Sequence, residues 1–199
     1  MLLPTPAISP TPRQRDLIRV AASLFAERGY HAVGVIDIGK ELGVTGPAVY
    51  RHYSSKKTLL VAVLDAMMTR HLQEVGDLAA ADGSPRMILE AIVRHHIEFV
   101  CDQGDSIITW RSEARTLPNT DRSRLSYLED LYVEGWVRTL RRLRPEVSAD
   151  QARSMCRATI ALVESPTSAS SALPTEQLRS VLQDMALQAL LGTAISRPD

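Results

Sequence analysis

The chain has little of what marks a secreted, membrane-spanning or metal-binding protein. Its 199 residues include only two cysteines, Cys101 and Cys156, which lie far apart and form no CxxC pair or metal-ligand spacing. We expect both to be small buried apolar residues. Apolar runs stay short of the roughly 20 residues that cross a bilayer, and residues 1–10 lack the segments of a secretory signal. The sequence therefore predicts a cytoplasmic protein with no membrane partner.

Catalytic motifs are missing as well. No Gly-rich phosphate loop, nucleophile elbow or HExxH occurs. His95 and His96 are adjacent, so on a helix they point about 100 degrees apart and cannot share a metal ion as an i, i+4 pair would. Glu98 and Asp102 could pair as acids, although exposed carboxylates are common on helices. We predict no enzyme activity, no catalytic or metal-binding residues and no cofactor.

Net charge is zero, but the charges are unevenly distributed. Through residue 60 the chain carries eight Arg or Lys against four Asp or Glu, and the remainder carries 15 against 19. A basic head on an acidic body fits contact with nucleic acid at one end of the protein. A chance fluctuation could produce the same difference, so the motifs must decide.

The segment from Val35 to Leu59 contains two short helical patterns. Ile38 and Leu42 share one face of the first pattern, and Val49 and Tyr53 share one face of the second. Between them Gly43 can take the left-handed conformation that closes a helix. Thr45 can then accept a backbone N–H as the N-cap of the next helix, with Pro47 in its first turn. Two short helices joined by such a turn are a helix-turn-helix, whose second helix enters the DNA major groove.

The side of the second helix opposite its apolar face suits contact with DNA. Arg51 can bind a guanine edge through two hydrogen bonds, while the Tyr50 hydroxyl and the His52 imidazole suit phosphate oxygens. Lys56 follows the small polar pair Ser54 and Ser55, which predicts the N-cap of the following helix. The Lys56 ammonium and the free N–H groups of that helix favour a phosphate. The predicted DNA-binding residues are Thr45, Gly46, Ala48, Tyr50, Arg51, His52 and Lys56.

The string GVTGPAVYRHYSSKKTLL, placed after AASLFAERGY, resembles the N-terminal DNA-binding domain of TetR-family transcriptional repressors. The resemblance covers about residues 12–65 and rests on helix count beyond them. It implies phosphate or groove contacts from Tyr50, His52 and Lys56, with Thr45 and Gly46 at the start of the helix.

Two positions depart from the family pattern. Many members carry a Thr and an Arg early in the preceding helix, where this chain has Gly34, Val35 and Ile36. A hydroxyl and a cation that help to hold DNA are therefore missing. Gly46 stands where some relatives place a base-reading side chain, so Arg51 and Thr45 are expected to read the bases instead.

The remaining sequence repeats a helical period without any alternating strand pattern. The predicted fold class is all-α, with a three-helix helix-turn-helix domain and a larger helical domain, about nine helices in total. The expected boundaries are a disordered lead at 1–10, a DNA-binding domain at 11–55, and a ligand-binding and dimerisation domain at 56–199. After the head, we place helices at about 56–75, 85–103, 105–116, 119–143, 148–163 and 175–195. Capping residues open four further helices: Thr11 with Gln14, Ser84, Ser148 with Gln151, and Thr175.

The family resemblance implies a cavity for an inducer among the later helices. Apolar walls with a few placed polar groups suit a small-molecule pocket, although any helical core has the same composition and is the commoner interpretation of each residue. The candidate ligand-binding residues are Ile92, His95, His96, Phe99, Trp110, Arg111, Glu113, Tyr127 and Trp136.

The strings TWRSEARTL and RLSYLEDLY resemble TetR-type repressors of fatty-acid or sterol catabolism that respond to acyl-CoA thioesters. This resemblance implies that Trp110 and Tyr127 line an acyl or ring channel, and that Arg111 or Arg115 meets phosphate or pantetheine oxygens. The competing interpretation pairs Glu113 and Arg115 with neighbouring charges on a solvated helix.

The last two helices carry more apolar residues than one buried face requires, and Leu187 and Leu191 fall off the main stripe of the final helix. We therefore predict a homodimer through 148–163 and 175–195, with a monomer as the alternative. A two-fold dimer would place its recognition helices roughly 34 Å apart on a palindromic operator. The sequence predicts a TetR-type repressor of double-stranded operator DNA, released by a small hydrophobic effector such as a fatty acyl-CoA. The alternative is a ligand-independent regulator or activator with the same head.

Overall fold

The computed structural model describes residues 10–113, 117–165 and 173–192, with the backbone alone for 103–112. Within these residues the chain is all-helical. Its eight helices are α1 (Pro12–Arg28), α2 (Val35–Glu41), α3 (Gly46–Tyr50), α4 (Lys56–Ala80), α5 (Pro85–Glu113), α6 (Asn119–Leu143), α7 (Ala149–Glu164) and α8 (Thr175–Leu191). The all-α prediction is confirmed.

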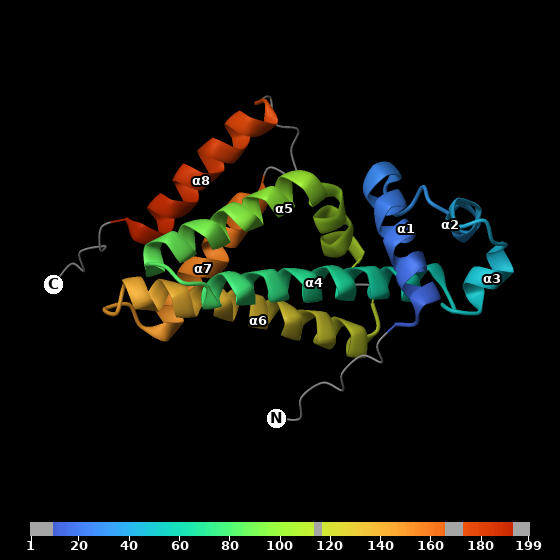
Figure 1. Cartoon of the computed structure of the whole chain (residues 1–199), viewed down its shortest axis with the longest axis horizontal. Coiled ribbons are helices and arrows are strands. Elements are labelled where there is room, and N and C mark those ends of the chain that lie inside the picture. The colour runs from blue at the N-terminus through green and yellow to red at the C-terminus, as the bar shows by residue number, and fades with distance from the viewer. Residues whose placement is uncertain (1–9, 114–116, 166–172, 193–199) are drawn as a thin grey trace. The chain divides into compact units, whose positions relative to one another are not determined.

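The chain forms two compact units. The first comprises Met1–His71 with Asp105–Glu129, and the second comprises Leu72–Gly104 with Asp130–Asp199. Helices α1, α2 and α3 lie close together in the first unit (Figure 1). Helices α7 and α8 pack against each other in the second.

Helix α1 begins and ends where its capping residues predict. The Thr11 hydroxyl accepts the N–H of Gln14 at 3.3 Å, and the Gln14 side chain accepts the N–H of Thr11 at 2.9 Å. Gly29, at φ +78°, ends the helix and donates its N–H to the carbonyl of Phe25. One face is buried against the rest of the first unit and carries Leu17, Val20, Ala21, Leu24 and Phe25. Because these residues recur at helical spacing, the burial follows from the sequence pattern.

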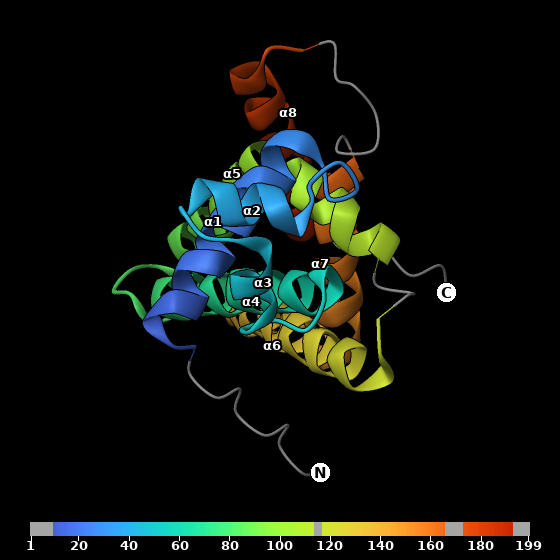
Figure 2. The same ribbon diagram turned by 90° about the vertical axis from the view of Figure 1, so that its right-hand side faces the viewer.

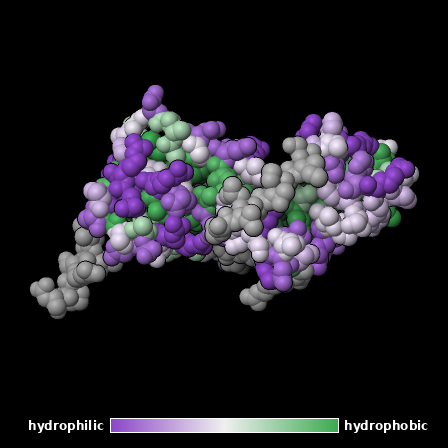
Figure 3. Space-filling view, turned by 90° about the horizontal axis from the view of Figure 1, so that it is seen from below, coloured by the Kyte–Doolittle hydropathy of each residue, from purple (hydrophilic) through white to green (hydrophobic). Residues whose placement is uncertain are grey.

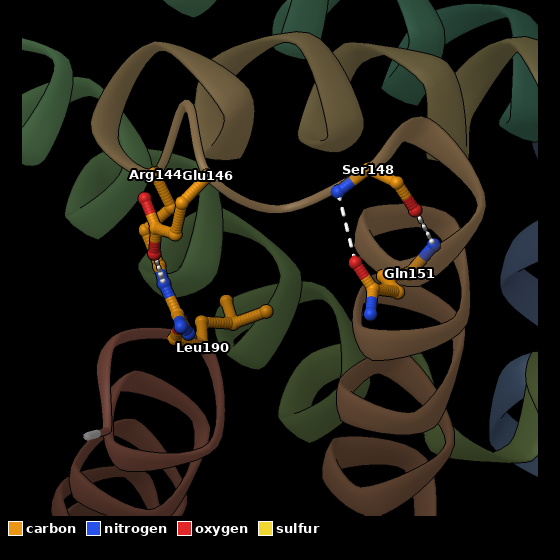
Figure 4. Close-up of polar contacts among 5 residues, drawn as sticks. All are labelled: Arg144, Glu146, Ser148, Gln151 and Leu190. Carbon is orange, nitrogen blue, oxygen red and sulfur yellow. Dashed lines mark hydrogen bonds and ion pairs between the residues drawn. The ribbon is translucent and has the colours of Figure 1, made fainter. Parts of the chain in front are cut away.

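In the second unit, α7 opens on the predicted capping box. The Ser148 hydroxyl accepts the N–H of Gln151, and the Gln151 side chain accepts the N–H of Ser148 (Figure 4). Nearby, the Arg144 guanidinium donates to the carbonyl of Leu190 at 3.1 Å and to Glu146 at 2.9 Å (Figure 4). This arginine ties the end of α6 to the end of α8, which supports the packing of the three C-terminal helices.

The described residues hold eight helices where the sequence indicated about nine. The helices expected at 85–103 and 105–116 are a single helix, α5, which continues through Gly104 to Glu113. A glycine inside a helix costs only about 1 kcal/mol relative to alanine. With no proline or capping residue beside it, Gly104 is not enough to end the helix.

Three smaller boundaries also differ. Helix α4 continues through Gly76 to Ala80 rather than ending near residue 75. Helix α8 ends at Leu191 with Gly192 as its C-cap, and not near residue 195. Thr175 is the first residue of α8 and makes no capping bond, because Pro174 holds the N-cap position. The expected disordered lead lies largely outside the described residues.

The cysteine prediction holds in part. Cys156 is fully buried, whereas Cys101 is half-buried. No helix among the described residues has the length and apolar character to cross a membrane. On the face drawn in Figure 3, hydrophilic residues cover large areas and hydrophobic residues show in smaller patches between them.

Candidate nucleic-acid interface

The turn between α2 and α3 is held by the backbone and by glycine. Gly43 has φ +66°, the left-handed conformation that the sequence predicted for it. The N–H of Val44 donates to the carbonyl of Gly39 at 2.8 Å. A Cβ atom at Gly39 would lie 2.8 Å from the carbonyl oxygen of Val44, so no side chain fits there. Gly39 therefore allows the close contact with Val44, and Gly43 allows the left-handed backbone of the turn.

Helix α3 has the two faces that its sequence predicted. Val49 is buried in α3, and Tyr53 is buried just beyond it. Tyr50, Arg51 and His52 are exposed, and about half of the Tyr50 surface is open to solvent, at 51%. Arg51 and His52 follow the last helical residue in a turn. In Figure 2, α2 and α3 face the viewer.

The start of α3 is built differently from the prediction. Thr45 is the N-cap residue, but its side chain makes no capping hydrogen bond, and the prediction of one is wrong. Its backbone carbonyl instead accepts the N–H groups of Ala48 and Val49. The threonine side chain is exposed, Ala48 is half-buried and Gly46 is buried. The Thr45 hydroxyl is therefore not engaged in capping the helix.

Helix α4 begins with a serine cap. The Ser55 hydroxyl accepts the N–H of Thr58 at 3.0 Å, as the sequence predicted. Lys56 is the first residue of the helix, and its ammonium lies 4.3 Å from the centre of the Tyr30 ring. The ammonium also donates to the carbonyl of His31 at 3.5 Å. A cation over an aromatic face is attracted by the ring quadrupole, so Lys56 is positioned by the turn that follows α1.

The surroundings of Lys56 were not predicted from the sequence. Partial burial lowers the pKa of Lys56, while the carboxylates of Glu113 and Asp37 oppose that change. Burial raises the pKa of Tyr30, and the charge of Glu113 adds to this. Glu113 lies 3.1 Å from the His31 imidazole. His31 and Glu113 lie 82 positions apart in the chain, and no local pattern indicates such a contact.

The structure brings together some of the predicted ligand-binding residues in the second unit. The His96 ring lies 5.6 Å from the Trp136 ring and 6.2 Å from the Phe99 ring, centre to centre. A 3.0 Å hydrogen bond joins His96 Nδ1 to the Tyr132 hydroxyl, and Glu164 lies 3.9 Å from His96 Nε2. Burial raises the pKa of Tyr132. The result is a buried aromatic cluster with a polar centre.

The other candidates are distributed more widely. Ile92 is fully buried in the second unit, while His95 is half-buried and lies 3.3 Å from Glu74, in a groove between α4 and α5. Glu113 and Tyr127 belong to the first unit, where Glu113 contacts His31 and Tyr127 is half-buried. The side chains of Trp110 and Arg111, like Arg115, lie outside the described residues.

Comparison with known proteins links the first unit to a family. Residues 17–63 match the profile of "Bacterial regulatory proteins, tetR family". The chain is 28% identical over 122 residues to the HTH-type transcriptional repressor KstR2 of Rhodococcus jostii, spanning 61% of this chain and 59% of that protein. It is 33% identical over 88 residues to the HTH-type transcriptional activator FasR of Mycolicibacterium smegmatis, spanning 44% and 40%.

The likeness in structure extends further than the likeness in sequence. The chain is similar to the transcriptional regulator FadR from Bacillus subtilis in complex with stearoyl-CoA, with a TM-score of 0.69 over 88% of this chain and 98% of that one. At 18% identity this shows a shared fold alone. The chain spans less than two thirds of the length of the KstR2 and FasR relatives.

Proposed function

Because the chain belongs to the TetR family of bacterial regulatory proteins, we propose that it is a transcriptional repressor that binds double-stranded operator DNA. One observation carries the proposal. The helix-turn-helix buries Val49 and Tyr53 on one side and leaves Tyr50, Arg51 and His52 exposed on the other. Side chains of this chemistry match the phosphates and base edges of a major groove. Such a protein acts where the DNA is, in the cytoplasm.

Each residue of the interface has a proposed part. Arg51 reads a guanine edge, and Tyr50 and His52 bind phosphate oxygens. Lys56 supplies a phosphate contact from a position fixed by the Tyr30 ring. The remaining members, Thr45, Gly46 and Ala48, form the start of α3, where the exposed Thr45 side chain reads a base beside Arg51.

We further propose that two copies bind one palindromic operator. Residues 11–55 form the DNA-binding domain, and residues 56–199 form the ligand-binding and dimerisation domain. Val181 and Met185, one turn apart on α8, are 44% and 46% exposed, while Leu182 and Ala186 beside them are buried. An exposed apolar row on a helix that also packs inward supports a homodimer through 148–163 and 175–195.

The proposed effector is a small hydrophobic molecule, with fatty acyl-CoA thioesters as the first class to test. The similarity to FadR in complex with stearoyl-CoA supports this class. Ile92, His96 and Trp136 supply buried apolar and aromatic surface in the second unit, and the half-buried Phe99 ring lies beside His96. A second candidate function, activation of transcription with the same DNA-binding head, is favoured by the match to the activator FasR.

The experiment is a gel shift on DNA flanking the protein's own gene, with and without acyl-CoA thioesters of increasing chain length. A specific complex that certain chain lengths release supports both a repressor and its effector class. A specific complex that none of them releases keeps the DNA-binding proposal and rejects acyl-CoA. If that DNA gives no specific complex, selection from random duplexes follows, and failure there rejects the proposed function itself. A reporter gene then separates repression from activation.

A further inference from the structure

Ile36 is a large apolar residue in an unusual place. It lies in α2, and 63% of its surface is exposed, more than for most large apolar residues in the described part of the chain. Its neighbour Val35 is buried, and the Asp37 carboxylate accepts the N–H of Gly34 at 2.8 Å, which fixes the start of the helix. The exposure of Ile36 is therefore imposed by a well-held backbone. Exposing so much apolar surface gains nothing for folding, because only surface removed from water stabilises the fold.

The Ile36 side chain extends toward the start of α3. A Cβ atom built on Gly46 would lie 3.4 Å from Cγ1 of Ile36, and apart from the chain neighbours and the backbone of α3 itself no other heavy atom comes within 4 Å of it. Ile36 thus lies beside the first residue of the helix that we propose to enter the major groove. Gly46 has no side chain of its own to offer there, and the isoleucine supplies one from the neighbouring helix.

The chemistry of the side chain restricts what it can contact. Ile36 has no hydrogen-bonding group, so phosphates and the polar edges of bases offer it no favourable partner. In the major groove, the thymine 5-methyl is the apolar group that distinguishes one base pair from another. A β-branched side chain is stiff about χ1, so it can present a methyl group at a fixed position with little loss of entropy.

We propose that Ile36 is a specificity residue that contacts the 5-methyl group of a thymine in each operator half-site. The inference rests on the proposed DNA-binding function and adds a base reader that carries no polar group. Arg51 reads a base through hydrogen bonds, and Ile36 reads another through apolar contact alone. Burying one methyl group is worth about fourfold in affinity per half-site.

The test uses the duplex selected by the DNA-binding experiment, with deoxyuridine replacing one thymidine at a time. This change removes the 5-methyl group and leaves Watson–Crick pairing intact. For the unaltered protein we expect a loss of about fourfold per half-site at one symmetric thymine position. For Ile36→Ala, affinity for the thymine duplex should already be reduced by about that factor, and the same replacement should cause no further loss.

Controls separate this contact from a structural role. Ile36→Val keeps the branched side chain and should retain most of the sensitivity to deoxyuridine. Met87→Ala truncates another exposed apolar residue, 64% exposed on α5, and should leave DNA affinity and its thymine dependence unchanged. Circular dichroism melting tests whether each variant is folded. We expect all of them to fold, because the side chains of Ile36 and Met87 are exposed.

The outcomes distinguish the two proposals. If no duplex is selected, the DNA-binding function fails. If the duplex is bound but Ile36→Ala keeps the full deoxyuridine effect, the thymine methyl is read by another residue and this inference is rejected. It is also rejected if no single replacement weakens binding of the unaltered protein.

Discussion

Arg51 and Tyr50 are adjacent and exposed at the end of α3, yet their side chains suit different parts of a DNA duplex. We predict that Arg51→Ala relaxes the base preference at one position of each half-site, at a cost of about 1–3 kcal/mol on the cognate sequence. The reason is that a guanidinium donates two hydrogen bonds to a guanine edge. Binding to a library of single-base variants of the selected site measures the effect.

Tyr50→Ala is the matched control for this prediction. A phenol that binds a phosphate oxygen carries no sequence information, so its loss should weaken binding to all sequences by a similar factor. If Arg51→Ala left the preferred sequence unchanged, the guanidinium would not be the base reader. If Tyr50→Ala changed the preferred base sequence, Tyr50 would be a base reader and not a phosphate contact.

For single residues, the sequence predicted the features that depend on residues nearby in the chain. The cap at Ser55, the left-handed Gly43 and the burial of Val49 each follow from residues a few positions away. The ammonium of Lys56 against the Tyr30 ring depends on a tertiary contact that no local pattern encodes. The exposure of Ile36 could have been predicted from the sequence, because this residue lies outside the apolar face formed by Val35, Ile38 and Leu42.

At the scale of the element, Gly135 lies at a close contact between two helices in the second unit. A Cβ atom there would lie 2.7 Å from Cγ1 of Val75, so the Val75 side chain of α4 packs directly on the Gly135 backbone of α6. We predict that Gly135→Ala destabilises the protein, because the added methyl group overpacks this crossing. Urea unfolding followed by far-UV circular dichroism gives the change in the free energy of unfolding.

Gly76→Ala provides the comparison on α4. Nothing lies within 4 Å of a Cβ atom at Gly76, so this variant gains only helix propensity and should be more stable by about 0.5–1 kcal/mol. Since both substitutions gain the same propensity, the difference between the two variants isolates the steric cost, at about 1–3 kcal/mol. Equal stabilisation by both would mean that the helices are not in close contact at Gly135.

Glycines inside helices also show where the prediction of helix boundaries from the sequence fails. Gly76 and Gly104 were both expected near a helix end, and the helices run through both of them. A single glycine weakens a helix without stopping it, so packing of the apolar faces on either side decides the boundary. Where a capping box accompanies the signal, as at Thr11 and Ser148, the predicted start is confirmed.

For the whole molecule, helical periodicity was sufficient to predict the all-α class and the helix-turn-helix. It was not sufficient for the body, because residues that share an apolar pattern are divided between units by tertiary packing. His96, Phe99 and Trp136 meet in the second unit, while Glu113 and Tyr127 belong to the first. A helical pattern states which face is buried and leaves open which neighbour buries it.

The proposed dimer is a property of the whole molecule and leads to a prediction about α8. We predict that Val181→Glu combined with Met185→Glu converts the dimer to a monomer, because two charges would be buried in the apolar interface. Light scattering after size exclusion measures the mass. DNA affinity should fall when the dimer is lost, since a monomer holds one half-site instead of two.

Met87→Glu is the control, because it places a charge on an exposed apolar residue of α5 and should leave a dimer. If the doubly substituted protein stayed dimeric, the dimer interface would not lie on Val181 and Met185 of α8. The proposed arrangement of the two recognition helices, which depends on that interface, would then be rejected as well.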